Sequence, residues 1–225
     1  MNPRDRLIVA LDVPEKGAAR ALVDQLAGRV GLFKIGSQVF TAAGPDLVRE
    51  IVARGDKVFL DLKFHDIPNT VAGAVASASH LGVSLVDVHG LGGRAMIEAA
   101  VGALPAMGTR LLAITILTSH DDGTLDEIGV NGSVVESVLR LAQLAKEAGA
   151  DGVVASPHEV QAIREACGRD FLIVTPGIRP AGAARGDQAR LATPAAALAA
   201  GADYLVVGRP ITEAADPAAA ADAIV

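Results

Sequence analysis

The stretch from Lys57 to Thr70, Lys-Val-Phe-Leu-Asp-Leu-Lys-Phe-His-Asp-Ile-Pro-Asn-Thr (KVFLDLKFHDIPNT), decides the fold. Its apolar beginning is typical of a buried strand, and its end carries Asp61, Lys63 and Asp66. Burying a single ion is costly unless it is paired and hydrogen-bonded. Several charges at the end of one buried strand therefore predict a site that gathers polar groups at that end.

The same kind of apolar run recurs along the whole chain. Near-continuous hydrophobic runs are typical of parallel strands that are covered on both faces. Eight strands are predicted: Leu7–Leu11, Leu32–Ile35, Val58–Leu62, Leu85–His89, Leu111–Leu117, Gly152–Ala155, Phe171–Thr175 and Tyr204–Val207.

Helix-length stretches separate these runs, and several of them end at glycine, as helices commonly do. The clearest helical patterns are Glu15–Leu26, Asn69–Leu81, Gly132–Ala148 and His158–Cys167. Glycines at the expected helix ends are Gly55, Gly82, Gly149 and Gly168. The phrase Ala-Gly-Ala-Asp, at 148–151 and again at 200–203, marks a helix end followed by a strand.

Eight strand–helix units in 225 residues predict an α/β fold, a single-domain (β/α)8 barrel over residues 1–225. The alternative is an open doubly wound sheet. The barrel is favoured because there are eight units, and because no Gly-x-Gly-x-x-Gly follows the first strand, where a dinucleotide-binding sheet would carry it.

Composition narrows the classes of function. The net charge of −6 argues against a nucleic-acid or acidic-membrane surface. Cys167 is the single cysteine, which fits a reducing, cytoplasmic location without a disulfide. No signal peptide is recognisable, and the longest uncharged stretch, Ile67–Val86, contains Pro68 and two glycines, so no membrane span is expected.

In a (β/α)8 barrel the active site lies at the carboxyl ends of the strands. The predicted strand ends carry mostly polar residues: Asp12, Lys34, Asp61 with Lys63, His89, Thr118 with Ser119, Ser156, Arg179, and Gly208 with Arg209.

Four of these residues, Asp12, Lys34, Asp61 and Lys63, form what we call the charged array. Asp61 and Lys63 are two positions apart, so on a regular strand they face the same side. Nearby carboxylates favour a protonated lysine, and such an ammonium can stabilise a developing carbanion and then protonate it. The alternative is a structural ion-pair network, which is plausible for any one pair but weaker for all four residues together.

A second polar region follows the last two predicted strands, where this fold often binds phosphate. Gly208 permits close approach of the backbone to a ligand, and Arg209 offers a planar fork to phosphate oxygens at the start of the last helix. The long segment 175–194 has the composition of a lid or binding loop. Its polar residues include Arg179, Arg185, Gln188 and Arg190, of which Arg185 and Arg190 are equally consistent with a solvated loop.

Other candidates carry weaker signals. The segment from His89 to Gly93 fits a tight turn better than an anion site, and the remaining histidines lack metal-ligand spacing. Thr118 and Ser119 could hydrogen-bond a substrate ring. No nucleophile elbow, phosphate-binding Walker loop or paired-cysteine motif is present.

Taken in order, these pieces resemble the orotidine 5'-phosphate decarboxylase family over essentially the whole chain. The segment from Asp61 to Thr70 is the most specific. The other matching pieces are Val9–Asp12, Phe33–Gly36, Leu117–Ser119, Thr175–Arg179 and Val207–Ile211.

The resemblance implies a cofactor-free and metal-free carboxy-lyase that converts orotidine 5'-phosphate to UMP in pyrimidine synthesis, as a homodimer with active sites shared between subunits. It implies that Lys63 protonates C6 of the pyrimidine. It also implies that Lys34, Asp61 and Asp66 surround Lys63 with charge, and that Asp66 and Thr70 come from the partner subunit. Asp12 and Lys34 would contact the ribose, and Ser119, beside Thr118, the pyrimidine. The implied phosphate contacts are Arg179, Gln188, Gly208 and Arg209.

Two other functions remain open from the sequence. A keto-gulonate phosphate decarboxylase or hexulose phosphate synthase shares the Asp-x-Lys-x-x-Asp signature but needs Mg²⁺, and Lys34 is a poor metal ligand. A catalytically silent barrel that binds phosphorylated metabolites has no need for a proton donor such as Lys63. Metal independence and turnover are the observations that separate these functions.

Overall fold

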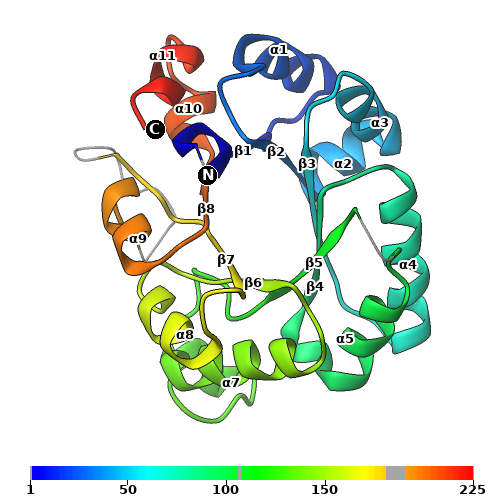
Figure 1. Cartoon of the computed structure of the whole chain (residues 1–225), viewed down its shortest axis with the longest axis vertical. Helices are drawn as coiled ribbons and strands as arrows, with labels where there is room; N and C mark the ends of the chain where they lie inside the picture. Colours follow the sequence, from blue (N-terminus) through cyan, green and yellow to red (C-terminus); the bar gives the residue numbers. More distant parts are fainter. Residues whose placement is uncertain (1, 106–107, 181–190, 225) are drawn as a thin grey trace.

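The computed structural model describes residues 2–105, 108–180 and 191–224. Eight parallel strands follow one another around a closed barrel, and helices surround it (Figure 1). The strands are β1 (Leu7–Ala10), β2 (Leu32–Gly36), β3 (Val58–Phe64), β4 (Leu85–His89), β5 (Arg110–Ile114), β6 (Gly152–Val154), β7 (Leu172–Thr175) and β8 (Tyr204–Val207). The predicted barrel is confirmed, and the open sheet is excluded because β1 pairs with both β2 and β8.

The helices connect the strands on the outside of the barrel. They are α1 (Lys16–Leu26), α2 (Ser37–Ala43), α3 (Pro45–Ala53), α4 (Pro68–His80), α5 (Gly93–Gly102), α6 (Asp122–Glu127), α7 (Val134–Glu147), α8 (Val160–Cys167), α9 (Pro194–Ala200), α10 (Arg209–Thr212) and α11 (Pro217–Asp222), with short 3-10 turns at Pro3–Arg6 and Gly90–Gly92. Each helix in the described part of the chain is too short or too polar to cross a membrane.

Side-chain alternation along the strands separates two layers of core. Outward-facing residues pack against the helices in the larger layer, as Leu7, Val9, Phe33 and Leu60 do. Inward-facing residues fill the barrel: Ile8, Ala10, Leu32, Phe59, Leu85, Leu112, Val174 and Val206. The positions two residues beyond the inward layer are Asp12, Lys34, Asp61, Asp87 and Ile114, so strand alternation carries the charged side chains to the carboxyl end of the barrel.

Two predicted strand ends differ from the structure by more than one residue. The fifth strand ends at Ile114 rather than Leu117, where the Thr115 side chain donates to the Val154 carbonyl (2.9 Å) and the chain turns. The third strand continues to Phe64 rather than ending at Leu62, because a bulge lets Phe64 pair with Val88.

The predicted helix ends follow from backbone geometry. Gly55, Gly82, Gly149 and Gly168 all have positive φ, between 81° and 88°, which side chains other than glycine rarely adopt. At the other end of α7, Ser133 and Glu136 form a reciprocal capping box. Local sequence and tertiary fold therefore agree at these boundaries.

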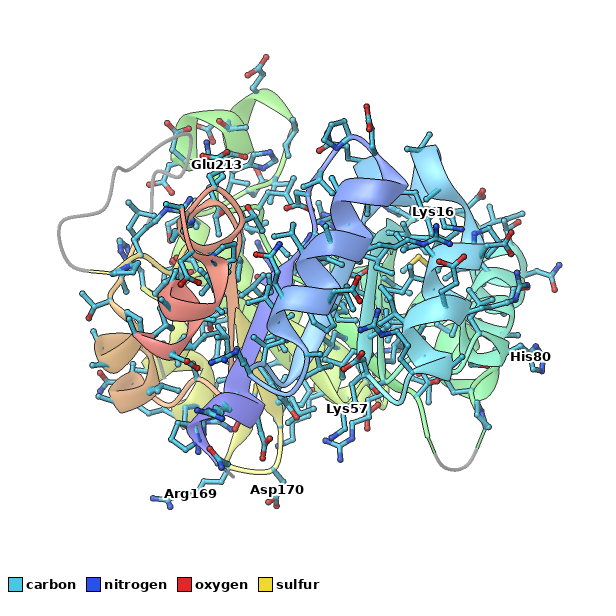
Figure 2. All side chains as sticks on the ribbon, turned by 90° about the horizontal axis from the view of Figure 1, so that it is seen from above. Lys16, Lys57, His80, Arg169, Asp170 and Glu213 are labelled. Atoms are coloured by element: carbon cyan, nitrogen blue, oxygen red, sulfur yellow. The ribbon has the colours of Figure 1, made fainter. Side chains whose placement is uncertain are left out.

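The two ends of the barrel differ in what they contain. Figure 2 shows Glu213, beyond β8, at one end and Lys57, Arg169 and Asp170 at the other. Near the amino end, Arg164 donates to the carbonyls of Gly168 (2.8 Å) and Phe171 (2.7 Å) and pairs with Asp203 (2.7 Å). These bonds hold α8 against the starts of β7 and β8. They lie at the end of the barrel opposite the polar strand ends.

Candidate active site

A cavity of about 490 Å³ opens at the carboxyl ends of the strands. Its wall is apolar along Phe59, Ile114, Ile116, Val154 and Val206, and polar elsewhere. The polar and glycine residues that line it are Asp12, Lys34, Asp61, Lys63, Thr118, Gly177, Arg179, Gly208, Arg209, Thr212 and Glu213. The cavity therefore brings the whole charged array together with Thr118, Arg179, Gly208 and Arg209.

Lys34 on β2 links two carboxylates. Its Nζ lies 3.0 Å from Asp12 Oδ1 and 3.1 Å from Asp61 Oδ2. A Cβ at Gly36 would lie 2.9 Å from this Nζ and 3.0 Å from the Asp12 oxygen, so glycine at that position leaves room for the pair. Both Lys34 and Asp61 are buried, whereas Asp12 is exposed at the mouth.

The paired charges decide which groups are ionised. Burial opposes the ionisation of Asp61, but the Lys34 and Lys63 ammonium groups hold its pKa well below the usual range. Burial likewise disfavours the Lys34 ammonium, yet Asp61 and Asp12 raise its pKa above the ordinary value. Asp61 is therefore an anion and Lys34 a cation across the neutral pH range.

Lys63 lies in an irregular part of β3. Its ammonium pairs with Asp61 Oδ1, and its side chain is 38% exposed toward the cavity. Its φ is +52°, the only positive value at a non-glycine residue among those described. Asp61 and Lys63 do reach one cavity, but the expected reason, regular alternation along a strand, is wrong because the backbone bulges between them.

Asp87 on β4 was not among the predicted site residues. It is completely buried, and its Oδ1 accepts the backbone N–H of Lys63 at 2.8 Å. The sequence does contain a signal for Asp87: it is an acid among the apolar residues of the run Leu85–Val88. That signal was not used in the prediction of the site.

The region predicted to bind phosphate is built differently from the expectation. Arg209 does not open the last helix: α10 is a single turn, and α11 follows it. Among the described residues, a Cβ at Gly208 would meet only the Ala10 side chain, at an ordinary 3.6 Å, so packing alone does not require glycine there. Phosphate binding at this end would depend on the arginine side chains more than on a helix terminus.

Three predicted site residues that the structure describes do not line this chain's cavity. Asp66, Thr70 and Ser119 are all exposed and lie outside its lining. Asp66 Oδ1 accepts the N–H of its neighbour Ile67 at 2.6 Å. Gln188 lies outside the described residues.

Two histidines stack beside Lys63. The rings of His65 and His89 are 5.3 Å apart and inclined by 19°. Burial, with His65 and Lys63 nearby, lowers the pKa of His89 to about 4, so its ring is neutral at neutral pH. Across the described ranges, no group of three or more His, Cys, Asp or Glu side chains could hold a metal ion.

Comparison with known proteins gives one consistent answer. The model of the Orotidine 5'-phosphate decarboxylase / HUMPS family matches residues 5–224. The orotidine 5'-phosphate decarboxylase of Halorhodospira halophila is 61% identical over 97% of this chain and 94% of its own, and that of Moorella thermoacetica is 56% identical over 100% and 92%. A crystal structure of the Lactobacillus acidophilus enzyme of that name has a TM-score of 0.86 at 43% identity, covering 97% of this chain and 96% of its own.

Proposed function

The chain belongs to the orotidine 5'-phosphate decarboxylase / HUMPS family and catalyses the decarboxylation of orotidine 5'-phosphate to UMP and CO2 in pyrimidine biosynthesis, and we propose that Lys63 is the proton donor of this reaction. The observation that carries the proposal is the ion pair between Lys63 and Asp61 inside the cavity.

The reaction needs a cation beside one ring carbon. When the bond from C6 to the carboxylate breaks, its electron pair stays on C6 and CO2 departs. A fixed ammonium stabilises that charge, and transfer of one proton from Lys63 forms the new C6–H bond. The neutral lysine then regains a proton from water.

The neighbours of Lys63 support this role. Asp61 is held ionised between Lys34 and Lys63, so it orients both ammonium groups. Orienting charges before the reaction reduces the reorganisation that the transition state would otherwise need. The apolar wall around Ile114 and Val154 provides a surface against which a planar ring can lie.

The remaining contacts are proposals that follow the family. Asp12 and Lys34 would bind ribose hydroxyls, and Ser119 the pyrimidine edge, beside Thr118. Arg179, Gly208 and Arg209 would hold the phosphate, together with Gln188. Binding energy at the phosphate, remote from C6, can be used to align the reacting ring.

We also propose a homodimer in which Asp66 and Thr70 of the partner subunit complete each site. Both residues are exposed in the single chain, and Ile67 between them is 67% exposed. The exposure of these adjacent side chains leaves them accessible to a second subunit, as a shared site requires. A cytoplasmic location is proposed as well, supported by the single buried cysteine, Cys167.

The test is the ultraviolet absorbance of orotidine 5'-phosphate mixed with the purified protein in EDTA. Conversion to UMP establishes the reaction and separates it from the Mg²⁺-dependent sugar-phosphate reactions of related barrels. No spectral change, with EDTA or with added Mg²⁺, would contradict the function and leave the silent phosphate-binding barrel as the better description.

A further inference from the structure

Asp87 is a buried acid whose hydrogen bonds are incomplete. It is 0% exposed, between the core residues Val86 and Val88 of β4. Oδ1 accepts one backbone N–H, but no donor from the described residues reaches the buried Oδ2. A buried oxygen in this state is costly, so its presence calls for an explanation.

The N–H that Asp87 accepts belongs to an irregular part of the neighbouring strand, β3. Leu60 pairs with Val86, and Phe64 pairs with Val88, so β3 advances four residues while β4 advances two. Lys63 lies inside this bulge. Its N–H is donated to the side chain of Asp87, in place of a main-chain carbonyl of β4.

The bulge also explains the conformation of Lys63. A φ of +52° is uncommon for a residue with a side chain and persists only where the surroundings fix it. The side chain is 38% exposed, and among the described residues its ammonium pairs with Asp61 alone, so it places little constraint on the backbone of Lys63. The bond from the backbone N–H to Asp87, in contrast, acts on the backbone of Lys63 directly.

We propose that Asp87 is a positioning residue: it holds the backbone of Lys63 in the left-handed conformation that directs the ammonium into the cavity. This inference rests on the proposed role of Lys63 and adds to it a residue that touches neither substrate nor the reacting atoms.

Protonation completes the arrangement. Burial and the Asp61 carboxylate raise the pKa of Asp87 well above its usual range, and the Lys63 ammonium opposes this only in part. The proton makes Asp87 a donor toward Asp61, which helps to keep the pKa of Asp61 low. The charged groups that face Asp87 are Asp61 and Lys63 on β3; its partner on β5 is the apolar Leu112, and His89, farther along β4, is neutral.

The experiment compares Asp87→Leu with Asp87→Asn. Leucine has a similar shape but accepts no hydrogen bond, whereas the asparagine amide can accept from Lys63 and donate to Asp61, as the protonated acid does. A misdirected proton donor slows the reaction without weakening remote contacts, so Asp87→Leu is expected to lose about 10²-fold in kcat while the Kd for UMP stays within about threefold. Asp87→Asn is expected to recover most of that kcat.

Asp151 provides a matched control. Its Oδ2 accepts the N–H of Leu111 at 2.8 Å, the same kind of bond, at the amino end of the barrel. Asp151→Ala should leave kcat unchanged, although it removes a comparable bond. Unchanged kcat in Asp87→Leu, or a loss in Asp87→Asn as large as that in Asp87→Leu, would overturn the proposal.

Hydrogen exchange at the Lys63 amide separates this proposal from the proposed function and needs no turnover. The amide is expected to be protected in the wild-type protein and in Asp87→Asn, and to exchange faster in Asp87→Leu. Should Asp87→Leu fail to fold, Asp87→Asn still decides: an amide that stays protected while kcat is lost, or an amide that loses protection while kcat is kept, would overturn the positioning role. If the wild-type protein does not convert orotidine 5'-phosphate, the function stated above is wrong. Hydrogen exchange still tests whether Asp87 holds the backbone of Lys63.

Discussion

The Nζ of Lys34 lies 3.1 Å from Oδ2 of Asp61, and each of these side chains is only 10% exposed. A buried ion pair adds little stability by itself, because desolvation offsets most of the attraction. Asp61, however, also pairs with Lys63. Its carboxylate therefore lies between two ammonium groups: that of Lys34, which is buried, and that of Lys63, which lines the cavity.

Asp61→Asn removes the anion that separates these cations. The two ammonium groups then repel each other, and the orientation of Lys63 is lost. We expect kcat to fall by about 10²-fold or more, since removal of one preorganised electrostatic contact commonly has an effect of that size. Steady-state kinetics with orotidine 5'-phosphate measure it. A variant with normal kcat would mean that Asp61 is only a structural partner of Lys34.

Arg209→Ala tests the division between binding and chemistry. Arg209 lines the cavity directly after β8, whereas Lys63 is on β3. A charge-assisted contact to phosphate contributes about 1.5–3 kcal/mol, so KM should rise about 10- to 10²-fold, with a smaller change in kcat. Arg20→Ala, on the exposed face of α1, is the control that should change neither parameter. A large loss in kcat with unchanged KM would assign Arg209 to the chemical step instead.

Stability against pH reports the protonation of Asp87. Its pKa is raised in the folded protein, whereas an aspartate in the unfolded chain titrates near about 3.9. Between those two pKa values the unfolded state has released a proton that the folded state keeps. Raising the pH therefore destabilises the wild-type protein there, by up to about 1.4 kcal/mol per pH unit, and this contribution is absent from Asp87→Asn.

Urea unfolding of both proteins at several pH values measures this difference. The free energy of unfolding of Asp87→Asn, relative to the wild type, should increase as the pH is raised from about 4 to about 7. The lowered pKa of Asp61 acts in the opposite direction, at more acidic pH, and Asp61 is present in both proteins. A difference that stays constant over this range would show that Asp87 is ionised in the folded state.

A mixture of two inactive variants tests the shared site. If Asp66 acts in the partner's cavity, a hybrid of Lys63→Ala and Asp66→Ala subunits contains one site with both residues intact. Equal amounts, unfolded and refolded together, should recover about a quarter of the wild-type activity, because half of the dimers are hybrids with one intact site each. Activity that remains at the level of the separate variants would place Asp66 in its own subunit's site or remove it from the mechanism.

The closed barrel could be predicted because its signals are local and repeated. Apolar runs of strand length and glycines at the helix ends, such as Gly82 and Gly149, recur at each unit. The positions of Asp12, Lys34 and Asp61 followed as well, since parallel strands bring their carboxyl ends to one rim. Each of these inferences needs only periodicity and chain order.

The bulge at Lys63 could not be predicted in this way. It arises from pairing between β3 and β4, and from the bond to Asp87, which lies 24 positions along the chain. Sequence spacing alone treated Asp61 and Lys63 as regular neighbours on one strand. The short α10 was missed for a similar reason: one helical turn and a longer helix begin with the same residues.

The most direct test of the central claim compares Lys63→Ala with Lys57→Ala in the decarboxylation of orotidine 5'-phosphate. Both lysines flank the apolar part of β3, but Lys57 is exposed at the amino end of the barrel, away from the cavity (Figure 2). If Lys63 is the proton donor, Lys63→Ala should lose at least about 10²–10⁴-fold in kcat, whereas Lys57→Ala should match the wild type. Near-normal turnover by folded Lys63→Ala would contradict the mechanism.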